Sequence, residues 1–354
     1  MKTLYSLILA ASLSTSLFAQ EDGPGNNWTE VNLAVTDHQV IPSYQAFALA
    51  AGQLEIVAGE FCNSPDTAGL ESFRQAFHGA MDGWQQIQHV QFGPITYFNW
   101  NYRLQFWPDD NGTGGRQLTA LLAGQDETQL APEVFAGQSV GVQGYPALER
   151  LLFDADSLQQ LQDEPFYCRV VQTVAANLAE MSAGVESRWR EEFRTTVANA
   201  DERGFFESAE DATIDFLKAL VEGTRRVQQQ KIESVLGEDR AGSRVRLAES
   251  WRSDRSIRNI KLNVAAFHAI FEDSVPSLSE VFVPDDVPGI LAAFENLEGT
   301  LATLPDSMNV ALETDQGFQG LQSARDDLDA LFETLEAALK NTDLYLGFNS
   351  LDGD

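Results

Sequence analysis

The carboxylate best placed for chemistry in this sequence belongs to Glu149, which closes the segment Gly144-Tyr145-Pro146-Ala147-Leu148-Glu149. Gly144 and Tyr145 suit a turn, and proline is favoured in the first turn of a helix, so the segment predicts a helix that starts near Pro146. Glu149 then lies one turn inside, near the positive end of the helix dipole. Two roles stay open: Glu149 can offset the dipole and pair with a neighbour such as an arginine, or it can bind a metal ion.

Four histidines could act as further metal ligands. His78 and His89 are eleven residues apart, so on one helix they lie roughly 16 Å from each other along the axis and cannot bind the same ion. Each would need ligands from another helix, and the competing interpretation is a polar residue on a partly solvated face. His38, near the N-terminus, and His268, on a predicted helix, are interpreted as structural.

Two other motifs imitate known sites. The segment Gly137-Gln138-Ser139-Val140-Gly141 matches GxSxG, but a nucleophile elbow requires a preceding strand, and none is predicted there. The run from Asp109 to Gly114 begins like a calcium loop, yet its twelfth position is Ala120 where an EF-hand has glutamate. An α/β-hydrolase and an EF-hand are therefore both disfavoured.

Charge and the N-terminal segment restrict the partners and the location of the protein. The chain of 354 residues carries a formal net charge of −30, so phosphates would repel it and nucleic acid is not an expected partner. The apolar run from Leu4 to Ala11, followed by small residues up to Ala19, is typical of a secretory signal. No later segment approaches about 20 apolar residues. We expect a signal peptide over residues 1–19 and a soluble periplasmic protein without membrane insertion.

Cys62 and Cys168 are the two cysteines of the chain. Thiols of exported proteins are commonly oxidised, and a bridge between these two would close a loop of about 106 residues, worth roughly 4 to 5 kcal/mol by chain entropy. The alternative is a pair of buried thiols that fill the core. Metal binding by the pair is disfavoured because no CxxC spacing is present.

The apolar pattern predicts an all-α fold. Apolar residues recur at spacings of three and four over residues 44–58, 70–87, 171–189, 217–227, 257–271 and 321–339. No comparable run alternates with a period of two. The length favours two domains, and the polar segment 199–204 is the candidate junction. We predict an N-terminal arm over 20–41 and two antiparallel bundles, similar to four-helix bundles, over 42–198 and 205–354.

Several short motifs resemble those of the imelysin-like family and occur in the same order, over most of the chain. They are Phe61-Cys62, the helix from Phe73 to Trp84 with Phe92-Gly93-Pro94 after it, Arg103 to Asp109, Arg116-Gln117-Leu118, Gln143 to Arg150, and the tail from Gly347 to Asp354. The family signature is GxHxxE. Gly144 and Glu149 match it, whereas Pro146 stands at the histidine position and cannot bind a metal through its side chain.

This resemblance implies an exported iron-uptake protein with two similar helical bundles and a site between them. The family was named for a proposed metallopeptidase, and the missing histidine argues against that activity here. The candidate residues of the implied cleft are Gly144, Tyr145, Glu149, Arg103, Trp107, Asp109, Arg252, Ser253 and Arg255, with Glu149 as candidate metal ligand. For Arg103 and Arg255 the alternative is an ion pair that joins the bundles, and for Trp107 and Trp251 a packing role.

We therefore expect a protein of iron acquisition that holds an iron species, or that partners an outer-membrane or redox component, without catalysis. Arginines beside aromatics and carboxylates suit an anionic or chelated ligand, such as a ferric complex or the carboxylates of haem. Iron, another metal ion or haem is the expected ligand. The alternatives are a metallopeptidase in which Glu149 acts with His78 or His89, and a scaffold that binds no ligand.

Overall fold

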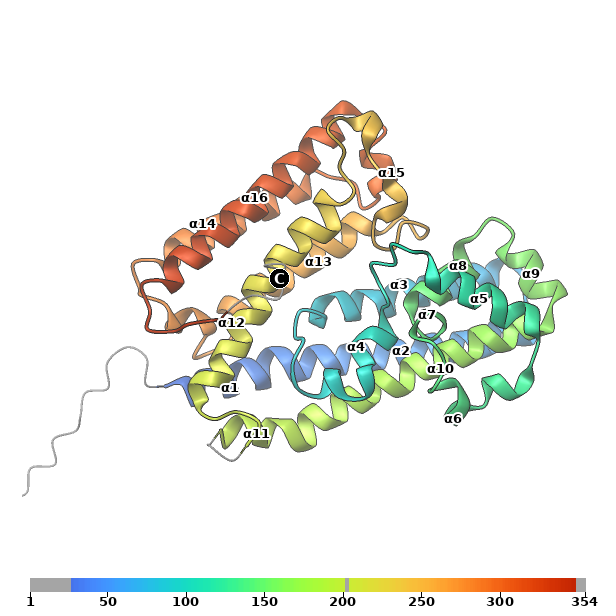
Figure 1. The fold of residues 1–354 in the computed structure, drawn as a ribbon, viewed down its shortest axis with the longest axis horizontal. Helices are drawn as coiled ribbons and strands as arrows, with labels where there is room; N and C mark the ends of the chain where they lie inside the picture. Colours follow the sequence, from blue (N-terminus) through green and yellow to red (C-terminus); the bar gives the residue numbers. More distant parts are fainter. Residues whose placement is uncertain (1–26, 201–203, 348–354) are drawn as a thin grey trace, which may run out of the picture.

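The computed structural model describes residues 27–200 and 204–347. The predicted signal peptide, the tail from residue 348 onward and residues 201–203 of the candidate junction lie outside the described residues. Across the described ranges the regular structure is helical and contains no strand, so the all-α prediction is confirmed there. Figure 1 shows two groups of long helices joined side by side.

The first group is built on three long helices, α2 (Ile41–Asn63), α3 (Thr67–Ile87) and α10 (Pro165–Arg188), with α2 packed against both others. The Asp66 carboxylate caps α3 by accepting a hydrogen bond of 2.7 Å from the Gly69 amide. Short helices follow α3, and those after α4 lie toward one end of the group in Figure 1. They are α4 (Trp100–Leu104), α5 (Thr113–Gly124), α6 (Pro132–Phe135), α7 (Val140–Gln143), α8 (Tyr145–Phe153) and α9 (Ser157–Asp163).

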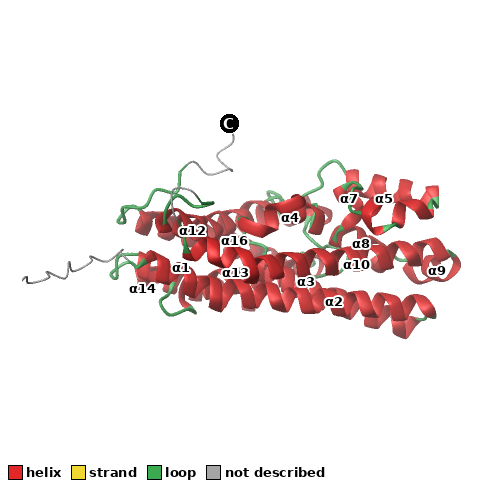
Figure 2. Ribbon diagram, turned by 90° about the horizontal axis from the view of Figure 1, so that it is seen from below, coloured by secondary structure: helices red, strands yellow, loops and turns green. Residues whose placement is uncertain are grey.

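The second group contains four long helices. They are α12 (Ala209–Arg226), α13 (Ser256–Glu272), α14 (Val287–Ala302) and α16 (Asp315–Leu339), and the short α15 (Met308–Ala311) precedes α16. Helix α16 packs against α14 and α12, and α13 packs against α12 and α14. The long helices of both groups run along one direction in Figure 2, whereas Figure 1 shows those of the second group inclined to α2 and α10. The irregular segment between α12 and α13 supplies part of the site described below.

The segment that we predict as an N-terminal arm is helical in the structure. Helix α1 (Trp28–Val35) continues through a π-helical turn, Thr36–Val40, directly into α2. Val31, Val35 and Val40 are buried, and this apolar face fixes the segment. The side-chain amide of Asn32 also donates a hydrogen bond to the Ala209 carbonyl at 2.8 Å, so α1 contacts the second group.

The two groups meet where α3 packs against α13, through a buried polar network. The Lys231 ammonium, 3% exposed, donates to Gln85 Oε1 at 2.9 Å, Glu249 Oε2 at 2.8 Å and Asn263 Oδ1 at 2.7 Å. Burial lowers the pKa of Lys231, and the charge of Glu249 opposes that shift. Every donor of this lysine is therefore used within the protein.

Two further features bear on the sequence predictions. Cys62 near the end of α2 and Cys168 in α10 have Cα atoms 5.6 Å apart, in the orientation of a disulfide-forming pair. Between residues 27 and 347, with 201–203 set aside, none of the helices is both long and apolar enough to cross a membrane.

Candidate functional site

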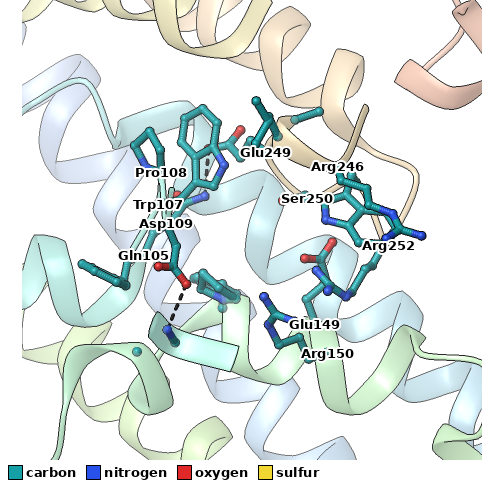
Figure 3. Close-up of a pocket in the computed structure, with 18 of the residues that line it drawn as sticks. Gln105, Trp107, Pro108, Asp109, Glu149, Arg150, Arg246, Glu249, Ser250 and Arg252 are labelled. Carbon is teal, nitrogen blue, oxygen red and sulfur yellow. Dashed lines mark hydrogen bonds between the residues drawn. The ribbon is translucent and has the colours of Figure 1, made fainter. Parts of the chain in front are cut away.

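A pocket of about 90 Å³ lies where the two helical groups meet. Its walls come from the loop after α4, the start of α8 and the irregular segment between α12 and α13, as Figure 3 shows. Seven charged side chains line it: Asp109, Asp110, Glu149, Arg150, Arg246, Glu249 and Arg252. Trp107, Tyr145, Pro146 and Trp251 are among its other lining residues.

The motif turn places Glu149 at this pocket. Gly144 precedes α8, and a Cβ added to it would lie 2.3 Å from the Leu104 carbonyl oxygen and 2.4 Å from that of Arg103. Only glycine allows this close approach between the turn and the end of α4. Pro146 occupies the first turn of α8, as predicted, and lines the pocket.

The Glu149 carboxyl group is held by the second helical group rather than left open. It is 5% exposed, and its Oε1 accepts hydrogen bonds from the Ser253 amide at 3.0 Å and the Ser253 hydroxyl at 2.6 Å. Burial raises the pKa of Glu149, while the bonds from Ser253 and the charges of Arg252 and Arg255 oppose the rise. Glu149 therefore connects two segments that are 104 residues apart in the chain.

Two other pocket carboxylates are also occupied by internal donors. Asp109 accepts from the Thr113 amide at 2.7 Å and the Gly114 amide at 2.9 Å, so it caps the first turn of α5. Glu249 belongs to the buried network and accepts hydrogen bonds from Lys231 and, at 2.7 Å, from the side-chain amide of Asn259. These carboxylates offer few free lone pairs to a cation.

The arginines of the pocket are less committed. Arg252 stacks on Trp251 with its guanidinium carbon 4.2 Å from a ring centroid, and Arg246 approaches the same indole at 5.7 Å. Arg252 also pairs with Asp154 at 3.1 Å. Burial and the nearby Arg150 guanidinium lower the pKa of Arg252. The side chains of Arg150 and Arg246 make no hydrogen bond or ion pair within the described residues.

The structure separates the predicted site residues into two sets. Tyr145, Glu149, Trp107, Asp109 and Arg252 line the pocket, whereas Gly144, Ser253, Arg103 and Arg255 do not. Gly144 and Ser253 nevertheless contact lining residues and shape the site.

The two remaining arginines have structural partners. Arg103 donates to Gln143 Oε1 at 2.7 Å and Asn177 Oδ1 at 3.1 Å, inside the first helical group. Arg255 is 1% exposed and pairs with Asp82 of α3 at 2.5 Å. For Arg255, the alternative of an ion pair between the two groups matches the structure. Arg103 has no such pair among the described residues.

The four histidines lie apart from Glu149 or are held by other groups. The Nδ1 atom of His78 lies 3.2 Å from the Arg255 guanidinium, and burial lowers the pKa of His78 to about 4. His89 is buried with its ring edge-on to Phe267, and burial lowers its pKa to about 3. His38 is exposed, and His268 Nδ1 lies 3.1 Å from Glu298 Oε1.

Comparisons with known proteins identify the class of fold and then the family. The chain superposes on an imelysin-like protein from Psychrobacter arcticum 273-4 with a TM-score of 0.73 and 19% identity, covering 91% of this chain and 97% of that one. A protein from Parabacteroides distasonis ATCC 8503, provisionally described as an iron-regulated protein A precursor, gives 0.75 and 13% with the same coverages. At these identities the likeness shows the fold alone.

The family follows from the sequence match. The imelysin family model matches residues 40–335, and the chain belongs to this family. Iron-regulated protein A of Synechococcus elongatus (strain ATCC 33912 / PCC 7942 / FACHB-805) is 27% identical over 202 residues. That match spans 55% of this chain and 52% of the relative, about half of each.

Within residues 27–200 and 204–347, the side chains do not fit a resident catalytic metal. Among the residues described, no three histidine, cysteine, aspartate or glutamate side chains converge as a metal site. Pro146 replaces the histidine of the motif, and the Glu149 oxygen that faces the second group already accepts two hydrogen bonds from Ser253. A catalytic zinc site commonly needs three protein ligands, and His78 and His89 are not placed to provide them.

Among the charged residues that line the pocket, sequence reasoning missed four: Asp110, Arg150, Arg246 and Glu249. Arg150 follows the motif glutamate directly, so its position was a usable signal. Arg246 and Glu249 lie in an irregular segment that has no helical period. Their place at the pocket depends on how the two helical groups pack, which no local pattern reveals.

Proposed function

We propose that this imelysin family member is an exported protein of iron acquisition that binds a small anionic iron chelate in the pocket between its helical groups, without catalysis. The observation that carries this proposal is the convergence of Arg150, Arg246 and Arg252 on one pocket. Of the four lining carboxylates, those of Asp109, Glu149 and Glu249 already accept internal hydrogen bonds, so the guanidinium groups are the main recognition elements. Guanidinium groups bind carboxylates through paired, charge-assisted hydrogen bonds.

The proximity of Arg150 and Arg252 favours an anion between them, although four carboxylates also line the pocket. Arg150 is close enough to Arg252 to lower the pKa of Arg252, so the two positive groups repel each other. An anion placed between them would relieve this repulsion. The flat Trp251 ring and the two arginines near it provide an additional surface for a planar carboxylate ligand.

The size of the pocket favours a compact ligand. Pockets for drug-sized ligands measure about 300 to 1,000 Å³, and this one measures about 90 Å³. A ferric complex of a small hydroxycarboxylate such as citrate suits that volume better than haem does. The iron is then cargo held through its chelator, which requires no histidine ligand from the protein.

Export and an iron-related role rest on separate support. The N-terminal sequence has the pattern of a secretory signal, and a structural neighbour is described as a precursor. The Synechococcus relative is named as iron-regulated. We extend export to the periplasm and iron regulation to this chain as part of the proposal.

Calorimetric titration of the purified protein with ferric citrate tests the function. The variant Arg150→Gln/Arg252→Gln should bind at least about tenfold more weakly, because each charged hydrogen bond is worth roughly 1.5 to 3 kcal/mol. Arg325→Gln is the matched control, since Arg325 does not line the pocket and pairs with the adjacent Asp326. No binding to the wild type, or equal binding to the double variant, would contradict the proposal.

The metallopeptidase alternative is tested with the same protein preparations. An enzyme should cleave an unfolded protein substrate, lose that activity with a chelator, and lose it again in Glu149→Gln. Such a pattern would overturn the assignment of a non-catalytic protein. A wild type that binds neither ferric citrate nor a protein substrate would favour the scaffold alternative.

A further inference from the structure

A second pocket, of about 250 Å³, lies on the other side of the wall formed by Gln105, Trp107, Pro108 and Glu249. These four residues line both pockets. The second pocket is rich in side-chain amides, which are contributed by Gln88, Gln91, Asn101, Gln105 and Gln230. We call it the amide pocket, and its assignment does not depend on the proposed iron function.

Part of the amide pocket is already committed to the fold. Gln105 Nε2 donates to Glu249 Oε1 at 2.7 Å, and its Oε1 accepts from the Trp84 indole. The Lys231 ammonium also lines the pocket, but its three donors are used by Gln85, Glu249 and Asn263. The wall that faces the first pocket is therefore fixed, with its lysine charge neutralised by Glu249.

Another part of the pocket has unused hydrogen-bonding capacity. In residues 27–200 and 204–347, the side chains of Tyr102, Arg226 and Gln230 make no hydrogen bond or ion pair. Arg226 is partly buried, and this burial lowers its pKa while the charge of Glu222 opposes the shift. A guanidinium that is withdrawn from water and lacks an acceptor is a ready partner for one anionic group.

The chemistry of these groups defines the ligand class. Each carboxamide offers both donors and acceptors, which matches the hydroxyl groups of a polyol. Trp107 and Tyr102 provide aromatic faces for an apolar C–H surface, each with a polar tip. One free guanidinium matches one carboxylate, and because Glu249 neutralises Lys231, a multiply charged phosphate is less well matched.

We propose that the amide pocket binds a sugar acid of the uronate type, a single hydroxylated ring that carries one carboxylate. Arg226 pairs with the carboxylate, and the ring packs beside Trp107 and Tyr102. Gln230 binds the hydroxyls together with the side-chain oxygens of Gln88 and Asn101, which accept no hydrogen bond within the described residues, whereas their nitrogens donate to Gln85 and Gln91. The volume, just under the range of about 300 to 1,000 Å³ for drug-sized ligands, suits one such ring. Smaller sugars without the carboxylate should bind more weakly.

The test is a calorimetric titration of the full exported chain with sodium D-glucuronate. D-glucose serves as the uncharged probe. The wild type should bind glucuronate saturably and at least about tenfold more tightly than glucose, the ratio expected for one charge-assisted contact. Arg226→Gln should remove this preference. Gln230→Ala, which breaks no side-chain hydrogen bond seen in the described structure, should weaken binding of both probes.

Two controls separate this site from the first pocket. Arg325→Gln should bind glucuronate as the wild type does, and so should Arg252→Gln, because Arg252 lines only the first of the two pockets. Absence of saturable glucuronate binding by the wild type would overturn the proposal. It would also be overturned if Arg226→Gln kept full affinity, or if Arg252→Gln rather than Arg226→Gln abolished binding.

Discussion

Arg255 should be among the most costly single residues to remove at the contact between the two helical groups. Its guanidinium is 1% exposed and donates to Asp82 Oδ1 at 2.5 Å, the His78 carbonyl at 2.8 Å and Asn259 Oδ1 at 2.8 Å. Arg255→Ala removes all three bonds and leaves a cavity. The buried acceptors of His78 and Asn259 then lack a donor, which carries a desolvation penalty.

The expected magnitude follows from the burial of this pair. Breaking a buried ion pair by removing one partner costs about 3 to 5 kcal/mol. A loss of 1 kcal/mol lowers Tm by roughly 2 to 4 °C in a domain of 150 to 250 residues, so we expect a decrease of roughly 6 to 20 °C. Arg258 offers a matched comparison because it binds the same carboxylate, at 2.5 Å, but is 44% exposed.

The comparison of the two arginines decides whether burial sets the cost. Urea unfolding followed by tryptophan fluorescence, together with calorimetry, should show that Arg258→Ala costs about 1 kcal/mol or less, as exposed pairs do. Arg255→Ala should cost several times more. Equal losses for the two variants, or a loss below about 1 kcal/mol for Arg255→Ala, would refute the reasoning.

Three further predictions concern buried groups. The pKa of Glu149 is raised in the folded state, so the contribution of Glu149 to the free energy of unfolding decreases as pH rises. Between pH 4 and 7 the free energy of unfolding of Glu149→Gln should therefore increase relative to that of the wild type. A difference between the two proteins that stays constant over this pH range would contradict this. Burial lowers the pKa of His89 to about 3. Acidification from pH 6.5 to 3 should therefore lower the free energy of unfolding of the wild type by roughly 4 kcal/mol more than that of His89→Leu. Reduction of the Cys62 and Cys168 pair should lower the free energy of unfolding by roughly 4 to 5 kcal/mol in urea titrations, and no change on adding reductant would argue against a bridge.

Sequence pattern was sufficient for the fold because helical periodicity is a local property. The periodic segments 70–87 and 321–339 fall within α3 and α16, where the buried face repeats every three to four residues. The N-terminal arm was the exception. The buried Val31, Val35 and Val40 show a spacing near one helical turn, but a π-helical turn interrupts the period before α2.

The site was only partly predictable because it depends on contacts between distant segments. Glu149 was found from a local turn and helix signal, and the turn before it forms as expected. The contact of Glu149 with Ser253 and the approach of Arg246 require the packed arrangement of both helical groups. The family resemblance likewise implied that Arg103 and Arg255 belong to the cleft, but their burial and partners show that each stabilises the fold and does not line the pocket.

The most direct test of the central claim is diffraction data collected at the iron absorption edge from crystals soaked in ferric citrate. The proposed function predicts an anomalous iron peak in the pocket, with the citrate carboxylates contacting Arg150 and Arg252. The same soak of Arg150→Gln/Arg252→Gln crystals should show no peak there. Wild-type crystals that bind iron elsewhere, or a peak that persists in the double variant, would contradict the account.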